Sequence, residues 1–165
     1  MITQQRLHEL LNYDPITGMF TWKVSTSNRR KPGDPAGVIT RYKNCTYMKV
    51  GVDGARYYAH RLAWLYVNGN MPSLIDHING DGTNNSITNL RPADKSKNAA
   101  NSKTRRDNKS GYKGVFRHPI TGNYGAFISC KGKRIYLGWY KSAEKAHAVY
   151  TQAAKNYFDE FARVS

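Results

Sequence analysis

A polar, basic stretch divides the chain and limits what it can fold into. Between Asp94 and Lys109 the sequence has almost no large apolar side chain, so these residues add little to a hydrophobic core. A chain of 165 residues has room for one ordinary core or for two small ones. We therefore expect two modules: residues 1–105, with the basic stretch at their end, and residues 106–165.

The chain carries a large excess of positive charge. It has 26 Lys and Arg residues against 11 Asp and Glu residues, a formal net charge of +15. A surplus of this size concentrates polyanions around a protein. Nucleic acid is therefore the expected partner, and a merely soluble basic protein is the alternative.

The cysteine content argues against a disulfide-rich or cysteine-zinc protein, and the lack of long apolar runs argues against a secreted or membrane-spanning one. Cys45 and Cys130 are the only cysteines, too few for a disulfide framework or a cysteine-rich zinc site, which favours a reducing, cytoplasmic setting. The first residues lack the apolar run of a signal peptide, and no segment approaches the roughly 18 apolar residues that span a bilayer. We expect a soluble protein with no membrane partner.

Residues 46–58 predict a β-hairpin. The dipeptide Asp53-Gly54 accepts the positive φ values of a tight turn, and it lies between the strand-like runs Thr46–Val52 and Ala55–Tyr58. Apolar residues then recur at helical spacing over residues 60–66, so we expect a helix in which His60 has a structural role.

A basic loop precedes this hairpin. Residues 19–24 predict a strand, and residues 25–34 follow it with Arg29, Arg30 and Lys31 set among Ser, Asn, Pro and Gly. Such a loop can lie against a phosphate backbone, and we count these three cations as candidate DNA contacts. A solvated loop is the alternative.

Residues 75–91 concentrate polar side chains around a glycine-rich loop at residues 80–82. Glycine, Asp and Asn favour tight turns, so the chain can reverse direction here. Asp94 can cap a following helix that carries Asn98. A strand, a loop and a helix can therefore bring their polar residues to one site.

The residue types in this segment suit phosphodiester hydrolysis, which needs an activated water and a cation near the leaving oxygen. The imidazole of His77 suits proton abstraction, whereas Asp76 and Asn98 offer hard oxygen ligands to magnesium or manganese. Neighbours on a strand point oppositely, so Asp76 and His77 can meet one phosphate only if the strand kinks or ends there. The alternative is that the polar residues only make turns and that His77 is a core histidine.

The order of these residues carries a resemblance. Asp76-His77 is followed by the loop, by Asn89-Leu90 and by Asn98, and the segment resembles the HNH nuclease family in its phage and intron-encoded homing form. Tyr13-Asp14-Pro15-x-Thr17-Gly18 and the run over residues 59–64 are similar to that group as well.

This resemblance implies a ββα-metal fold and a DNA endonuclease of a phage or mobile element, acting in the host cytoplasm. It implies that His77 is the general base, that Asp76 and Asn98 hold one divalent ion, and that Asn89 braces the loop. Asn98 stands where many members have a final His, which favours Mg²⁺, with Mn²⁺ possible, over zinc.

Residues 111–165 predict three strands followed by one helix. The strands are Tyr112–Arg117, Tyr124–Cys130 and Lys133–Tyr140, and Ser142 can cap the helix. Small residues on one stripe of that helix would let it lie close to the sheet. The whole chain is therefore expected to be α+β, with a nuclease module followed by a three-stranded antiparallel sheet packed on one helix.

One face of this sheet mixes cations with aromatic groups, which suits groove binding. Gly114-Val115, Tyr124-x-Ala126-x-Ile128, the run Gly132-Lys133-Arg134-x-x-Leu137-Gly138 and Ala153-Ala154 are similar to the APETALA or ethylene-response-factor DNA-binding domain. The resemblance implies a DNA-facing sheet that includes the following residues: Lys113, Arg117, Arg134 and Tyr136. A packing module with a solvated sheet face is the alternative. Three cations of the basic stretch are further candidate phosphate contacts: Lys103, Arg105 and Arg106.

Together these features predict a metal-dependent homing-type endonuclease that cuts double-stranded DNA. A non-catalytic DNA-binding regulator is the alternative from another class, and an RNA-binding protein is a weaker one. One nuclease motif per chain favours a monomer that nicks, although a dimer could cut both strands.

Overall fold

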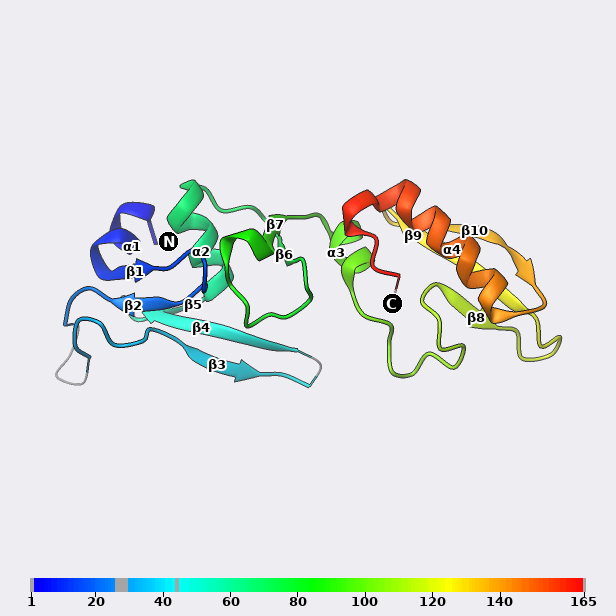
Figure 1. The fold of residues 1–165 in the computed structure, drawn as a ribbon, viewed down its shortest axis with the longest axis horizontal. Coiled ribbons are helices and arrows are strands. Elements are labelled where there is room, and N and C mark those ends of the chain that lie inside the picture. Colours follow the sequence, from blue (N-terminus) through cyan, green and yellow to red (C-terminus); the bar gives the residue numbers. More distant parts are fainter. Residues whose placement is uncertain (1, 26–29, 44, 165) are drawn as a thin grey trace. The chain divides into compact units, whose positions relative to one another are not determined.

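The computed structural model of the chain describes residues 2–25, 30–43 and 45–164. It is an α+β structure with two compact units, residues 1–92 and residues 93–165 (Figure 1). The predicted fold class is therefore confirmed. The units divide ahead of the basic stretch, whereas the predicted nuclease module runs to residue 105, and that extent of the module stays a prediction.

The described residues of the first unit form short helices and three small sheets. Its helices are α1 (Gln4–Leu10), α2 (Ala59–Asn68) and the 3₁₀ turn η1 (Ile87–Asn89). Its strands are β1 (Leu11–Tyr13), β2 (Phe20–Trp22), β3 (Val38–Arg41), β4 (Thr46–Val52), β5 (Ala55–Tyr58), β6 (Ile75–His77) and β7 (Leu90–Pro92).

The chain enters this unit through a capped helix and a two-stranded sheet. The hydroxyl of Thr3 accepts a hydrogen bond from the Arg6 amide at 3.2 Å, which caps α1. Strands β1 and β2 pair antiparallel, and the turn between them ends at Gly18, where φ is +73°. The predicted strand over residues 19–24 is shorter in the structure.

The hairpin predicted at Asp53-Gly54 is confirmed. Both turn residues have positive φ, and β4 pairs with β5 on one side and with β3 on the other. Val50 and Val52 on one face of β4 are buried in the core of the unit, which α1, α2 and β2 also supply. Helix α2 packs on β4 and β5, so the hairpin and the helix form one layered block (Figure 1).

Strands β6 and β7 form the sheet that carries the candidate site. They pair antiparallel, with Asp76 opposite Arg91 and His77 opposite Leu90. Ile75 and Leu90 are buried in the same core as α2. The loop between the two strands is therefore anchored at both ends.

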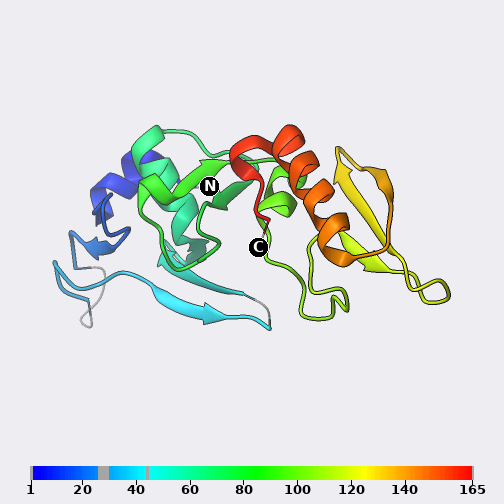
Figure 2. The same ribbon diagram turned by 45° about the vertical axis from the view of Figure 1, so that its right-hand side comes forward.

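The second unit is one sheet covered by a helix. Its elements are α3 (Lys95–Asn101), β8 (Val115–Arg117), β9 (Tyr124–Cys130), β10 (Lys133–Tyr140), α4 (Ala143–Phe158) and η2 (Asp159–Phe161). The strand order is β10-β9-β8, all antiparallel, and α4 lies across the sheet (Figure 2). The predicted three-stranded sheet packed on one helix is confirmed.

Small residues let α4 approach this sheet closely. Ala146, Tyr150 and Ala154 are buried on the helix, and Ala126 and Ile128 are buried on β9. Gly114 has a φ of +71°, and a Cβ there would lie 2.0 Å from the Tyr150 ring. The chain therefore joins β8 only after this glycine, which is why the predicted strand over residues 112–117 starts later. Within the described part of the chain, no helix is long and apolar enough to cross a membrane.

Candidate active site

Asp76 and His77 lie next to each other at the end of β6, and both are buried. The strand stops at His77: the amide of Gly80 donates to the His77 carbonyl at 2.8 Å, and Ile78 donates to the Asn89 carbonyl at 2.9 Å. Because β6 ends at His77, the strand does not force the Asp76 and His77 side chains to opposite sides, as their meeting at one phosphate requires.

Asp76 is held by an ion pair across the β6–β7 ladder. Its Oδ2 accepts a hydrogen bond from Nε of Arg91 at 3.0 Å, and both side chains are largely buried. A buried carboxylate is costly unless it is paired, so the guanidinium of Arg91 offsets the cost of burying Asp76. A divalent ion bound by Asp76 would share the carboxylate with Arg91.

The ring of His77 is oriented by Asn85. Nε2 of His77 lies 3.3 Å from Oδ1 of Asn85, while Nδ2 of Asn85 donates to the Thr83 carbonyl at 3.0 Å. An amide whose nitrogen is used as a donor presents only its oxygen on the other side, so Nε2 of His77 carries the proton. The neutral ring then has its lone pair on Nδ1. Burial lowers the pKa of His77, although Asn85 and the charge of Asp76 partly oppose this shift.

Asn85 is itself fixed by the first strand pair. It is 1 % exposed, and its carbonyl accepts a hydrogen bond from the Tyr13 hydroxyl at 2.7 Å. A Cβ at Gly18 would lie 2.3 Å from the backbone of Asn85, so only glycine lets the turn approach so closely. Sequence reasoning missed Asn85, because four asparagines occupy this loop and only packing shows which one reaches His77.

Asn89 closes the base of the loop. Its Oδ1 accepts from the Asn79 amide at 3.0 Å, and its Nδ2 donates to Oδ1 of Asn79 at 3.1 Å and to the Asn84 carbonyl at 2.8 Å. A buried side chain with three such bonds ties residues far apart in the loop together. This geometry suits the bracing role predicted for Asn89.

His60 packs directly against His77. The two ring centroids are 4.9 Å apart with the planes nearly perpendicular, and His60 also stacks on Tyr58 at 5.5 Å. Nδ1 of His60 is buried without a hydrogen-bond partner in the described part of the chain. Burial, helped by the nearby His77 and Arg61, lowers the pKa of His60 to about 3. His60 is therefore a neutral ring that forms part of the site's wall.

The predicted metal ligands come from different units. Asp76 lies in the first unit, whereas Asn98 lies on α3 of the second, where it is exposed and follows the Asp94 cap. Among the described residues no group of three His, Cys, Asp or Glu side chains could hold a metal ion. One carboxylate and one amide oxygen fit Mg²⁺, which commonly keeps several waters and binds few protein groups.

Arg134 and Tyr136 lie on the open face of the second sheet, as predicted. The guanidinium of Arg134 stacks 3.6 Å from the ring centroid of Phe127, and Tyr136 and Trp139 are exposed nearby. Trp139 joins this face because a bulge between Tyr136 and Gly138 shifts the register. Sequence alternation alone did not indicate that tryptophan.

Lys113 and Arg117 sit elsewhere in the second unit. Lys113 precedes β8, and its ammonium donates to the carbonyls of Ala100 and Ser102, where burial lowers its pKa to about 8. Arg117 is exposed, but it pairs with Tyr124 on the face of the sheet that α4 covers. Their predicted contact with DNA stays a prediction.

The other predicted cations are exposed. Lys103, Arg105 and Arg106 lie in the loop after α3. Lys103 and Arg105 line a cavity of about 1040 Å³, whose other lining residues include Phe116 and Phe127.

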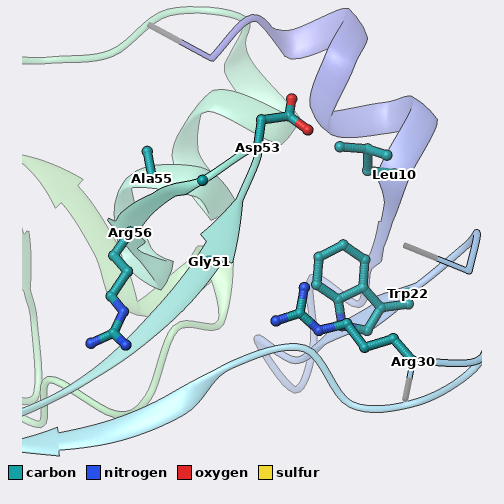
Figure 3. A pocket seen from close by; sticks show the side chains of 8 residues that line it. Leu10, Trp22, Arg30, Gly51, Asp53, Ala55 and Arg56 are labelled. Atoms are coloured by element: carbon teal, nitrogen blue, oxygen red, sulfur yellow. The ribbon is translucent and has the colours of Figure 1, made fainter. Parts of the chain in front are cut away.

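The cations of the first unit lie in the loop before the hairpin. Lys31 is exposed, and Arg30 stacks 4.9 Å from the Trp22 ring beside a cavity of about 360 Å³ that Arg56 also lines (Figure 3). Arg29 lies outside the described residues.

Comparison with known proteins identifies the segment that carries the site. Residues 57–100 match the family described as HNH endonuclease, whereas no curated protein matches the chain. The match begins in β5 and ends in α3, so it includes Asp76, His77, Asn89 and Asn98. The relation of the second unit to APETALA or ethylene-response-factor domains stays a prediction. Residues 57–100 are therefore similar to an HNH endonuclease domain, and such a domain implies a phosphodiesterase nuclease that acts on DNA.

Proposed function

We propose that the protein is a site-specific DNA endonuclease of the homing type, in which His77 activates water and a Mg²⁺ ion is held by Asp76 and Asn98. The observation that carries this proposal is the hydrogen bond between His77 and Asn85 at the end of β6. It places the proton of the neutral imidazole on Nε2, so Nδ1 is the basic atom.

His77 acts as the general base in this proposal. A general base must be unprotonated before it takes a proton, and burial of His77 favours the neutral ring. His60 and Tyr47 flank the ring at centroid distances of 4.9 Å and 6.1 Å, which limits its rotation. Orientation by Asn85 and these neighbours keeps Nδ1 directed at one position.

Asp76 and Asn98 are the proposed ligands of the Mg²⁺ ion, and Mn²⁺ is the alternative ion for the same site. When bound, the ion supplies positive charge to the oxygen that leaves the phosphorus. Arg91 holds the Asp76 carboxylate in place through the hydrogen bond to Oδ2. Asn89 keeps the loop closed, so that Asp76 and His77 retain their relative positions.

The second unit is proposed as the DNA-reading module. Arg134 stacks flat on Phe127, which leaves the guanidinium edge to donate two parallel hydrogen bonds to a guanine in a major groove. Tyr136 and Trp139 supply further exposed surface beside it. The exposed cations of residues 103–106 would add phosphate contacts that do not depend on sequence.

The experiment that tests this function is the mapping of DNA ends. Purified protein is incubated with the genome that encodes it, with Mg²⁺ in one sample and with a chelator in the other. A homing-type endonuclease produces ends at one or a few positions, and only in the sample with Mg²⁺. Ends scattered without preference would leave a non-specific nuclease, and no ends in any sample would favour the DNA-binding regulator.

A further inference from the structure

The outer face of the sheet β3-β4-β5 carries a continuous group of tyrosines and cations. Lys49 pairs with Tyr58 and Gly51 pairs with Arg56, while Tyr47 is two residues before Lys49 on the same strand. Side chains alternate between the faces of a strand, so these residues share the face opposite to the buried Val50 and Val52. We call the group formed by Tyr42, Tyr47, Lys49, Arg56 and Tyr58 the tyrosine–cation face.

The cation at the centre of this face is held in place. Nζ of Lys49 lies 4.6 Å from the Tyr58 ring and 5.5 Å from the Tyr42 ring, and the two tyrosine hydroxyls are 3.4 Å apart. The Tyr42 hydroxyl also raises the pKa of Lys49 above its usual value. A cation placed between two aromatic rings loses less freedom when it binds an anion.

One end of the tyrosine–cation face touches the candidate active site. The Tyr47 ring centroid lies 6.1 Å from that of His77 and 5.8 Å from that of His60. Gly82 of the loop after His77 packs so tightly here that a Cβ would lie 2.6 Å from the Tyr47 ring. The catalytic loop therefore abuts the strand that carries Lys49.

The other end continues into the basic loop. Arg56 lines the cavity beside Arg30 and Trp22 (Figure 3). From Gly51 to Tyr47 the strand advances about 14 Å at the usual rise, which is longer than the distance between neighbouring phosphates of one DNA strand. The face is therefore long enough to contact more than one phosphate of a DNA strand.

The charge of this face is suited to a polyanion. None of the described residues that the register assigns to it is acidic. The nearest carboxylate in the sequence, Asp53 of the turn, already binds the Arg6 guanidinium at 2.9 and 3.1 Å. The cations of the face are therefore left to act on an external anion.

We propose that the tyrosine–cation face binds the phosphate backbone of duplex DNA and leads the strand to be cut toward His77. This inference rests on the proposed function, because it takes His77 as the catalytic residue. It assigns the first unit its own binding surface, independent of base sequence and of the sheet in the second unit. Lys49 and Arg56 supply the charge, and the tyrosine hydroxyls supply hydrogen-bond donors.

The test is the salt dependence of duplex binding by the full chain. Lys49→Gln and Arg56→Gln are made in a His77→Ala background, so that binding is measured without cleavage on a short duplex of random sequence. Each variant should weaken binding and reduce the slope of log affinity against log salt by about 0.9, because one phosphate contact is lost. Arg41→Gln is the matched control, since Arg41 is exposed on the opposite face of the same sheet, and its slope should equal that of the parent.

Two results would overturn the inference. Slopes for Lys49→Gln and Arg56→Gln that equal that of Arg41→Gln would show that the face does not touch the backbone. Weaker binding of single-stranded DNA alone, with duplex binding unchanged, would show that the tyrosine rings stack on unpaired bases instead. The proposed function is tested separately, by comparing DNA cleavage by His77→Ala with cleavage by the parent protein. If the variant cleaved like the parent, the role of His77 would be refuted, but the binding result would still stand.

Discussion

At the scale of single residues, Asn85 and His60 determine the state of the His77 imidazole, the proposed general base. Asn85 fixes which nitrogen of His77 holds the proton, and His60 packs against the ring as a neutral neighbour. Asp76 and His77 could be chosen as candidate site residues from sequence because they are adjacent and precede a glycine-rich segment. Asn85 and the contact with His60 could not, since both depend on packing between residues distant in the chain.

Asn85→Leu should lower kcat about five- to tenfold and leave KM nearly unchanged, because one neutral hydrogen bond of about 1 kcal/mol that orients the base is lost. The ¹⁵N chemical shifts of the His77 ring should show that the proton is no longer confined to Nε2. Asn85→Asp, which keeps an acceptor for that proton, should retain the parent's tautomer. Unchanged ring shifts in Asn85→Leu would mean that Asn85 has only a packing role.

Because His60 is buried as a neutral ring, it should make the first unit less stable as the pH falls. Its folded-state pKa of about 3 lies below the ordinary value of 6.5, so between these pH values only the unfolded chain takes up the proton. Stability that is present above pH 6.5 is therefore lost as the pH falls toward 3, by about 1.4 kcal/mol per pH unit. Urea unfolding of the parent and of His60→Leu, followed by tryptophan fluorescence, measures the difference. Equal pH slopes for the two proteins would contradict the assignment.

At the scale of elements, turn residues in the sequence predicted regular hairpins and sheets, whereas irregular strands and bulges could not be predicted. The hairpin at Asp53-Gly54 and the sheet of residues 115–140 follow from sequence because their signals are local. Strand β3 was not predicted, since its four residues include an exposed Val38 and an exposed Ile39 without clear alternation. The bulge that exposes Trp139 depends on Gly138, whose φ of +127° has no signature beyond the glycine itself.

Arg134→Ala should reduce the preference for the native site over random DNA, because a good bidentate contact is worth roughly 1 to 3 kcal/mol of discrimination. Arg134→Lys should lose most of the same preference, since an ammonium lacks the planar fork that stacks on Phe127. Competition binding against random duplex measures the ratio. The double variant Arg105→Ala with Arg106→Ala is the control, and it should weaken both complexes about equally. An unchanged ratio in Arg134→Ala would leave the sheet as a packing module.

At the scale of the whole molecule, the chain joins two small modules for which we propose separate tasks. The first unit has a hydrophobic core from α1, α2 and β4, and it carries Asp76, His77 and the tyrosine–cation face. The second has its own core beneath α4 and an open aromatic and basic sheet face. Cleavage needs only base, metal and phosphate, whereas site selection needs base-edge contacts, so the two tasks can be altered independently.

The central claim is that His77 is the general base, and the most direct measurement compares cleavage and DNA binding by His77→Ala. His8→Ala, which removes an exposed imidazole from the same unit, is the control. Loss of a general base should lower the cleavage rate about 10²- to 10⁴-fold while the affinity for duplex DNA stays near that of the parent. Cleavage by His77→Ala at the rate of His8→Ala would contradict the claim.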